Sequence, residues 1–358
     1  MKFIPNDEPP ARRFVSAQQV AELAGVSRSA VSRAFTPGAS IATETREKVM
    51  RAAEELGYQV NDLARSLLAH RSRLVGLVVT KPELGFRAHL VAALTRALIR
   101  RGNVPFIINT GSSEPEMRAA QTALFGYRAE ATVILSGSPP TSFVELARQN
   151  GQPLIMIGRS EPDCDRIQID NASAAREAAQ LFAAQGLRRL ALAGSASGTP
   201  SIVEREQAFV SEARRLGADV IVVQGRDSDY AGGQEAAARL FGNGRPPEAV
   251  FCVNDLIAFG LIDTARSDHA LIAPRDFQVV GFDDIPEAAW NAYRLSTFRQ
   301  DPDEIAGCAI TLLDRRLATP SALPSTTRLK AAFVQRSSTG VVSSPFARAF
   351  RGRQGGRR

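Results

Sequence analysis

Two arginines near the N-terminus, Arg28 and Arg33, have the spacing and the chemistry to bind the edges of nucleic-acid bases. A guanidinium donates two parallel hydrogen bonds, and the O6 and N7 acceptors of guanine match that fork in the major groove. For this chemistry both arginines must lie on the outer face of one short helix. Val31 and Phe35 occupy the inner face of the same segment at helical spacing, which supports that placement.

The residues before these arginines predict two helices joined by a tight turn. Ser16 followed by Gln19 is a capping box, so a helix begins at Ala17. Gly25 can end it in the left-handed conformation, and Ser27 can cap a second helix. Two short helices with a glycine-containing turn form a helix-turn-helix. An ordinary helical hairpin is the alternative, but the caps, the turn glycine and the outward arginines together favour DNA binding.

A third helix is expected from Thr43 to Leu56, where apolar residues recur at helical spacing before Gly57. Side chains near its start are candidates for contacts with phosphate, and an exposed helix face is the alternative. These candidates are Thr43, Thr45, Arg46 and Lys48.

Charge is distributed unevenly along the 358 residues. The formal net charge of +7 divides into +3 in residues 1–73, −1 in residues 74–340 and +5 in residues 341–358. Basic ends on a neutral middle favour a nucleic-acid binder with a separate regulatory body. For the last segment, a solvated and disordered tail is the simpler interpretation.

Composition and missing motifs argue against several other classes of protein. The sequence is 44% apolar and 23% charged, as in soluble globular proteins. No uncharged apolar run reaches the roughly 18–20 residues of a membrane helix. The N-terminal residues lack the apolar stretch of a signal peptide, so we expect a cytoplasmic protein.

No catalytic or cofactor motif is found: GxSxG, GxxxxGK[ST], HExxH and GxGxxG after a strand are all absent. We therefore expect no enzymatic activity, no metal and no cofactor. The histidines and cysteines are scattered and lack metal-ligand spacing. They are His70, His89, His269, Cys164, Cys252 and Cys308.

From Leu74 onward, short apolar runs alternate with helical stretches such as 89–101, 172–184 and 203–216. This alternation predicts parallel sheets covered on both faces, and the number of units favours two doubly wound sheets. Ligands bind beyond the carboxyl ends of such strands, which places a cleft between two lobes. The predicted strands are residues 74–80, 104–110, 131–137, 153–158, 166–170, 189–194, 218–224, 249–253 and 277–282.

Several segments also resemble a known family. They are VSAQQVAELAGVSRSAVSRAF, TREKVMRAAEELGY and NDLARSLL near the N-terminus, then RLVGLVV, RLALAGS, AVFCVNDLIAFG, VVGFDDIP and LSTFRQD. From Val15 to about Gly340 the chain resembles the LacI/GalR (lactose-repressor) family of transcription regulators. The resemblance implies an α/β protein: an all-α helix-turn-helix headpiece plus a periplasmic-binding-protein-like core of two doubly wound parallel-sheet lobes.

The resemblance also implies domain boundaries. The core has a lobe nearer the DNA, which we call the near lobe, and a far lobe. The expected parts are a disordered extension (1–14), the headpiece (15–60), a hinge helix and linker (61–73), the core (74–340) and a basic disordered tail (341–358). Within the core, the near lobe takes about 74–169 and 298–328, and the far lobe about 171–295 and 329–340.

For DNA binding the resemblance implies a hinge helix that orders on the operator and presses Leu67 into the minor groove as an apolar wedge. Packing of Leu63 and Leu67 against each other is the alternative. Two positions depart from the family pattern: Val60 replaces a proline before the hinge, and Ala42 replaces a capping Ser or Thr. The expected DNA contacts are Ser16, Gln18, Arg28, Ser29, Ser32, Arg33, Thr45, Asn61, Ala64 and Leu67.

In the far lobe, Arg205, Asn254 and Asp283 match the family's effector contacts. A guanidinium, an amide and a carboxylate can together donate to and accept from adjacent hydroxyls, which suits a polyol. A salt bridge between Arg205 and Asp283 is the alternative role, and both can hold.

Other expected effector contacts are Phe86, Arg87, Arg159 and Trp290. Phe86 stacks on a ligand ring or packs in the core. Arg87 stands where the family has an aromatic residue, which favours a carboxylate or phosphate on the ligand. Trp290, the only tryptophan, lines the cleft or, as we favour, packs beneath it.

We therefore expect a sequence-specific transcriptional regulator, a repressor rather than an activator. Its operator is pseudo-palindromic double-stranded DNA, and its affinity is controlled by a small polar effector, a sugar or sugar derivative. A homodimer is expected, because residues 341–358 lack the leucine heptads of a tetramerisation helix. The alternatives are a solute-binding protein that acts in transport and an enzyme. The headpiece argues against transport, and no nucleophile or metal pattern supports an enzyme. No membrane contact is expected.

Overall fold

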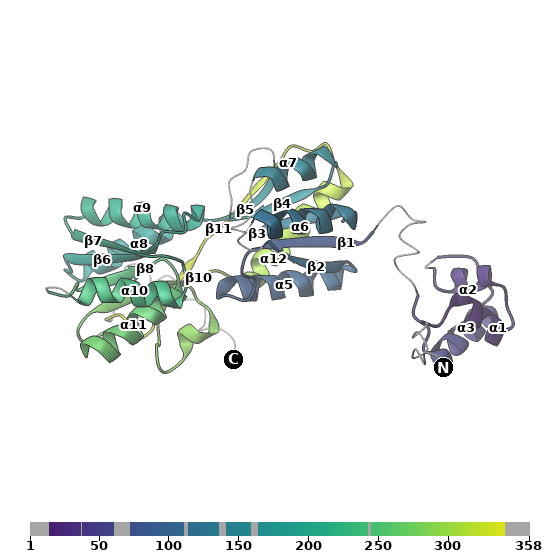
Figure 1. Ribbon diagram of the computed structural model, residues 1–358, viewed down its shortest axis with the longest axis horizontal. Helices are drawn as coiled ribbons and strands as arrows, with labels where there is room; N and C mark the ends of the chain where they lie inside the picture. The colour runs from purple at the N-terminus through teal and green to yellow at the C-terminus, as the bar shows by residue number, and fades with distance from the viewer. Residues whose placement is uncertain are drawn as a thin grey trace, which may run out of the picture. The chain divides into compact units, whose positions relative to one another are not determined.

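The computed structural model describes residues 14–36, 38–60, 72–110, 114–135, 141–158, 164–242 and 245–340. The expected N-terminal extension, hinge helix and basic tail fall almost wholly outside these residues. The chain divides into two compact units, one ending at Ser72 and the other beginning at Arg73 (Figure 1). Each unit is built around its own apolar core.

The first unit is a three-helix headpiece with helices α1 (Ala17–Ala24), α2 (Arg28–Ala34) and α3 (Thr43–Leu56). Its core is small: one valine from each helix, Val20, Val31 and Val49, is almost completely buried. Phe35 packs its ring against Tyr58 at 5.6 Å between centroids. The small core makes the helix ends important for stability, because each end leaves backbone groups that need partners.

The helix ends follow the sequence prediction closely. Ser16 and Gln19 form a complete capping box on α1. Gly25 and Gly57 adopt the left-handed conformation that ends α1 and α3, at φ of 64° and 65°. Ser27 caps α2. Ala42 provides no side-chain cap for α3, because an alanine side chain has no hydrogen-bond acceptor. A helix cap of this kind stabilises by about 1 kcal/mol, so α3 lacks a contribution that its neighbours have.

The second unit contains two six-stranded sheets (Figure 1). The near-lobe sheet has the order β11-β5-β4-β3-β1-β2 and is parallel throughout. Its strands are β1 (Leu74–Val79), β2 (Val104–Asn109), β3 (Ala131–Leu135), β4 (Leu154–Ile157), β5 (Asp165–Ile169) and β11 (Thr326–Leu329). Its helices are α5 (Phe86–Arg101), α6 (Glu114–Gly126), α7 (Thr141–Gln149) and α12 (Pro302–Ala318).

The far-lobe sheet has the order β12-β10-β9-β8-β6-β7, and only β12 runs antiparallel to its neighbour. Its strands are β6 (Arg189–Ser195), β7 (Asp219–Gly225), β8 (Ala249–Cys252), β9 (Gln278–Asp283), β10 (Ser296–Arg299) and β12 (Ala332–Val334). Its helices are α8 (Asn171–Ala184), α9 (Pro200–Arg215), α10 (Tyr230–Phe241), α11 (Asp255–His269) and the short 3-10 helix η1 (Pro286–Ala289).

The predicted fold class is confirmed, and the differences lie in short elements. The strands β10, β11 and β12 are missing from the predicted apolar runs, because each is only three or four residues long and two of them are partly polar. Since β10 pairs with β9, Phe298 and Arg299 stay in the far-lobe sheet, and the chain returns to the near lobe only after them. Among the described strands, the chain therefore crosses from one lobe to the other three times, after β5, after β10 and after β11.

Candidate functional site

The recognition helix α2 divides cleanly into a buried and an exposed face. Ala30, Val31 and Ala34 pack inward. The four predicted base-reading or backbone contacts on this helix are exposed: Arg28, Ser29, Ser32 and Arg33. The Arg33 Nε donates to the Ser29 carbonyl at 3.4 Å, and a guanidinium has four further N–H donors.

The remaining headpiece candidates have local partners. The Ser16 Oγ accepts from the Gln19 amide at 3.3 Å, and the Gln18 amide donates to Glu22 at 2.9 Å. Both Ser16 and Gln18 are exposed, and Thr45 is half-buried at the start of α3. Of the predicted hinge contacts, Asn61, Ala64 and Leu67 lie outside the described residues.

Arg46 has a structural role that the sequence did not indicate. Its guanidinium donates to the Ala34 carbonyl at 2.6 Å and to the Ala39 carbonyl at 3.3 Å. It therefore ties α3 to the end of the recognition helix and to the loop that follows. Lys48 pairs with Glu44 at 2.8 Å across one helical turn. Arg46 therefore has a structural role, and a phosphate contact by its remaining donors stays a prediction.

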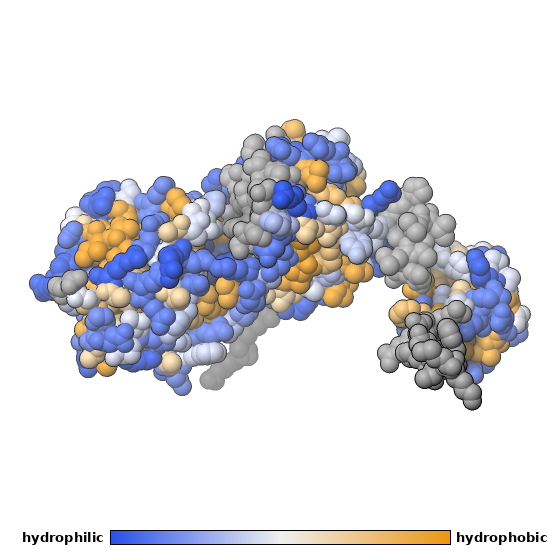
Figure 2. Space-filling view, in the orientation of Figure 1, coloured by the Kyte–Doolittle hydropathy of each residue, from blue (hydrophilic) through white to orange (hydrophobic). Residues whose placement is uncertain are grey.

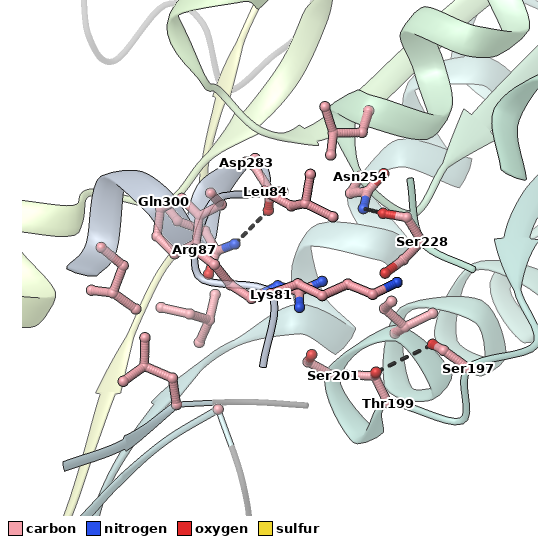
Figure 3. A pocket seen from close by; sticks show the side chains of 18 of the residues that line it. Lys81, Leu84, Arg87, Ser197, Thr199, Ser201, Ser228, Asn254, Asp283 and Gln300 are labelled. Atoms are coloured by element: carbon pink, nitrogen blue, oxygen red, sulfur yellow. Dashed lines mark hydrogen bonds between the residues drawn. The ribbon is translucent and has the colours of Figure 1, made fainter. Parts of the chain in front are cut away.

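The second candidate site is a cavity of about 210 Å³ between the two lobes (Figure 3). It lies at the carboxyl ends of the strands, where open α/β sheets bind ligands. Residues after β1, β7, β8 and β10 and the last residue of β9 line it, together with the beginnings of α5 and α9. The volume is below the ~300–1,000 Å³ of drug-sized pockets, so it suits a small ligand such as a single sugar ring.

Arg205 is the most constrained residue of this pocket. It is only 5% exposed, and its Nε donates to Asn171 at 2.8 Å while a terminal nitrogen donates to the Val253 carbonyl at 2.7 Å. The guanidinium carbon lies 3.5 Å above the ring of Phe282. Burial lowers the pKa of Arg205 to about 10, although the carboxylate of Asp283 opposes the shift. The residue therefore remains charged at neutral pH.

Asp283 lies 3.7 Å from the Arg205 guanidinium, so the salt bridge expected as the alternative is present, and both residues line the pocket. Gln300 donates to the Asp283 carboxylate at 2.6 Å (Figure 3). Burial raises the pKa of Asp283 to about 6, against the lowering effect of Arg205, Gln300 and Arg87. Part of this environment is Asp255, a fully buried carboxyl whose pKa is raised by burial and by the charge of Asp283.

Asn254 lines the same pocket but is already committed to the backbone. As the N-cap of α11, its Oδ1 accepts from the Ile257 amide at 2.9 Å. Its Nδ2 donates to the Ser228 carbonyl at 2.8 Å (Figure 3). One amide hydrogen is left for a ligand. The predicted group of Arg205, Asn254 and Asp283 therefore faces one cavity, with its members held by protein contacts.

The near-lobe candidates have different outcomes. Phe86 and Arg87 line the pocket, and the Arg87 guanidinium donates to the Thr80 carbonyl at 2.6 Å. Arg159 lies outside the described residues. Trp290 does not belong to the pocket: it follows η1 at the surface and is 56% exposed. Both expectations for Trp290, lining the cleft and packing beneath it, are corrected, because the η1 turn directs the residue outward.

Sequence reasoning missed an ion pair between the lobes. Lys81 follows β1 in the near lobe, Asp227 follows β7 in the far lobe, and the Lys81 ammonium donates to the Asp227 carboxylate. It also missed three hydroxyl side chains at the start of α9: Ser197, Thr199 and Ser201. Their signal was positional, because all follow strand ends on the ligand side of a sheet.

Comparison with known proteins identifies both units. Residues 17–61 match the pattern described as bacterial regulatory proteins, lacI family, and residues 179–339 match a periplasmic binding protein-like domain. The HTH-type transcriptional regulator CelR of Thermobifida fusca is 30% identical over 317 residues, which cover 85% of this chain and 92% of CelR. The chain belongs to the lacI family.

Other lacI-family relatives cover the chain similarly. The ribose operon repressor of Escherichia coli K12 is 28% identical over 332 residues, 91% of this chain and all of that protein. A solved CelR–cellobiose complex matches with a TM-score of 0.69 at 26% identity, over 90% of this chain and 99% of that one. A lac repressor dimer bound to operator and the anti-inducer ONPF has a TM-score of 0.82 at 23% identity, over 92% and 100% of the two chains, which shows a shared fold.

Membership in the lacI family makes this protein a DNA-binding transcription regulator with a ligand-binding core, and it favours regulation over transport. In the part of the chain that the structure describes, no helix combines the length and apolar character needed to cross a bilayer.

Proposed function

We propose that the protein is a homodimeric repressor that binds a pseudo-palindromic operator through paired headpieces and changes its operator affinity when a sugar or sugar derivative binds between the lobes. The observation that carries this proposal is the combination in one chain of an exposed, arginine-bearing recognition helix and a polyol-type pocket between the lobes. Neither feature alone requires a ligand-controlled repressor.

On the DNA side, the proposed base contacts are Arg28, Ser29, Ser32 and Arg33, with Ser16, Gln18 and Thr45 nearer the phosphates. The exposure of the arginines supports this assignment, since base readout needs free donors on the outer face of the helix. The hinge contacts Asn61, Ala64 and Leu67 remain predictions of the sequence. An inserted leucine unstacks one base step and explains bending without any base-specific hydrogen bond.

On the effector side, the proposed contacts are Phe86, Arg87, Arg205, Asn254 and Asp283, and Arg159 remains a prediction. The sugar class is supported by the donor set and by the relatives, which include a ribose operon repressor and a CelR structure with cellobiose. Allostery requires that the ligand contact two lobe arrangements differently. A pocket walled by both lobes meets that requirement.

A dimer is supported by exposed apolar surface along one edge of each lobe. The edge strands β2 and β7 expose Val104 and Ile107 in the near lobe and Ile221 and Val222 in the far lobe, each 45–50% exposed. Figure 2 shows hydrophobic surface over both edges. Exposed apolar side chains on edge strands favour contacts with another chain. A symmetric dimer would also present two recognition helices to the two halves of a palindrome.

The test begins with selection of an operator from random DNA, followed by binding measurements with Arg33→Ala. Loss of a bidentate guanine contact should weaken operator binding by about 1–3 kcal/mol and relax preference at one base pair, while binding to mixed DNA changes little. Arg51→Ala is the matched control, because Arg51 is an exposed arginine on α3. Equal losses for both variants, or equal losses on specific and mixed DNA, would reduce Arg33 to a phosphate contact.

A further inference from the structure

The two walls of the pocket differ in chemistry. The far-lobe wall offers hydroxyl and amide groups from Ser197, Thr199, Ser201, Ser228 and Asn254 (Figure 3). The near-lobe wall is built mainly of aliphatic side chains, and its polar exceptions include two cations, Lys81 and Arg87. A ligand that satisfies both walls needs hydroxyls on one side and, on the other, an apolar face with a group that accepts from cations.

Charge in the pocket is not balanced by the protein. Three cations and two carboxylates line it. Lys81 pairs with Asp227, and Arg205 pairs with Asp283. Among the described residues, no carboxylate lies within 4.0 Å of the Arg87 guanidinium, whose hydrogen bond goes to the neutral Thr80 carbonyl at 2.6 Å. A guanidinium has five N–H donors, so Arg87 keeps both charge and donors for a ligand.

Arg87, at the start of α5, lines the same cavity as Lys81, which follows β1. Its charge has a lowering effect on the pKa of both Asp283 and Asp227. An anion held in this cavity therefore meets the charge of Arg87 as well as that of Lys81. Half-buried cations that line one cavity bind carboxylate or phosphate more strongly than a neutral hydroxyl, because charge-assisted hydrogen bonds are about twice as strong.

The Lys81–Asp227 pair joins the two lobes and remains open to solvent. The side chains are 41% and 37% exposed, so a ligand entering the pocket can reach both. Asp227 does not depend on Lys81 alone, since its other oxygen accepts from the Ser228 amide at 2.7 Å. An exposed ion pair contributes little stability, about 0–1 kcal/mol, and a competing anion can replace one partner.

We propose that the effector is an anionic polyol, a sugar acid or a sugar phosphate, whose anionic group binds Arg87 and takes Lys81 from Asp227 while its hydroxyls face the far lobe. This inference rests on the proposed function, in which the pocket holds the effector. The direct Lys81–Asp227 contact between the lobes is then replaced by a contact that runs through the bound ligand. The ligand thereby contacts the open and closed arrangements of the lobes differently.

The test uses the full-length protein and three matched sets of probes in thermal-shift and calorimetric titrations. The sets are D-glucose and D-ribose, the acids D-gluconate and D-ribonate, and the phosphates D-glucose 6-phosphate and D-ribose 5-phosphate, with inorganic phosphate as an arm for the anion alone. We expect the anionic probes to raise the melting temperature of the wild type more than the neutral sugars do. Whichever of the two anionic sets, acids or phosphates, raises it more identifies the anionic group of the effector. Arg87→Gln and Lys81→Gln should each weaken that binding about tenfold or more.

Two further variants sharpen the result. Asp227→Asn leaves Lys81 without its partner and should tighten anion binding several-fold. Arg96→Gln, on an exposed turn of α5 where Arg96 pairs with Asp303, removes an equal charge outside the pocket and should change nothing. If no anion stabilises the wild type in an Arg87-dependent way, the proposal is wrong. Operator binding is measured in parallel. If a neutral sugar binds the pocket and operator binding is intact, only the proposal of an anionic effector is refuted, and the proposed repressor function stands.

Discussion

Replacing Asp283 by asparagine should weaken ligand binding without lowering stability at neutral pH. The two side chains have nearly the same shape, and the Oδ1 atom of the introduced amide would still accept from Gln300. A pKa raised from 3.8 to about 6 means that the fold disfavours the ionised form of Asp283 by about 3 kcal/mol relative to the protonated form. An amide avoids that cost. The expected change in unfolding free energy at pH 7.5 therefore lies between zero and a gain of about 3 kcal/mol.

The opposing effect is the loss of a partner for Arg205. Removing one member of a buried ion pair typically costs about 3–5 kcal/mol, because the other charge is left without compensation. Here the Arg205 guanidinium keeps Asn171, the Val253 carbonyl and the face of Phe282. The attraction between Arg205 and Asp283 is also already included in the raised pKa. We therefore expect the burial cost of the carboxylate to decide the sign.

The pH dependence follows from the direction of the shift. The folded protein holds the Asp283 proton more tightly than the unfolded chain, so the stability that this proton provides is complete below about pH 4 and lost as the pH rises through 6. The asparagine variant has no such proton. Its advantage over the wild type should be greatest above pH 6 and shrink steadily towards pH 4.

Urea unfolding followed by circular dichroism between pH 4.5 and 7.5 measures this difference, and calorimetry measures the ligand. Exchanging a carboxylate acceptor for an amide should weaken effector binding about tenfold, since hydrogen bonds to charged groups are the stronger ones. Asp219→Asn, at an exposed position at the start of β7, is the matched control. A loss of more than ~2 kcal/mol at pH 7.5, or a difference that does not vary with pH, would refute the reasoning.

Two other substitutions test the packing and the electrostatics of the far lobe, with a third, on α12 of the near lobe, as a control. Gly260→Ala should destabilise by about 2–3 kcal/mol on denaturation, because the added Cβ would lie 2.0 Å from the Tyr230 carbonyl, whereas Gly307→Ala meets nothing within 4 Å and should be neutral or stabilising. Glu212→Gln should cost about 1–2 kcal/mol at pH 7, since hydrogen bonds from Arg215 and Gln180 lower the pKa of Glu212 to about 2 and exposed Arg215 is partly screened by solvent. That cost should fade as the pH drops below 4.5 towards 2, and a cost that persists in acid would assign it to packing instead.

The headpiece was predictable because its determinants are local. A capping box, two helix-ending glycines and a capping serine each act within four residues, and each has the predicted conformation. Arg46 was not predictable in the same way. Its role depends on where the carbonyls of Ala34 and Ala39 come to lie, and a charged residue near a helix start carries no mark that separates this role from a phosphate contact.

The pocket was predictable only in part. Arg205 and Asp283 could be assigned because they stand in recognisable segments at strand and helix ends. Lys81 and Asp227 are 146 residues apart, and their meeting depends on how one lobe faces the other. Trp290 shows the opposite error: the only tryptophan was expected to line the cleft or, as favoured, to pack beneath it, whereas its position after a surface turn leaves it exposed. Pairings between lobes need the three-dimensional structure.

The order in which the strands enter the sheets has a consequence for the protein as it is synthesised. The outermost strands β11 and β12 complete the near and far sheets, yet both come from residues 326–334, after every other described strand. The headpiece can fold as soon as it leaves the ribosome, whereas β5 and β10 each lack one neighbouring strand until almost the whole core has emerged. Exposed edges recruit other strands, so the interval before β11 and β12 dock is when the nascent chain is most prone to aggregation. A ribosome stalled before Thr326 would display a folded headpiece attached to two unfinished lobes.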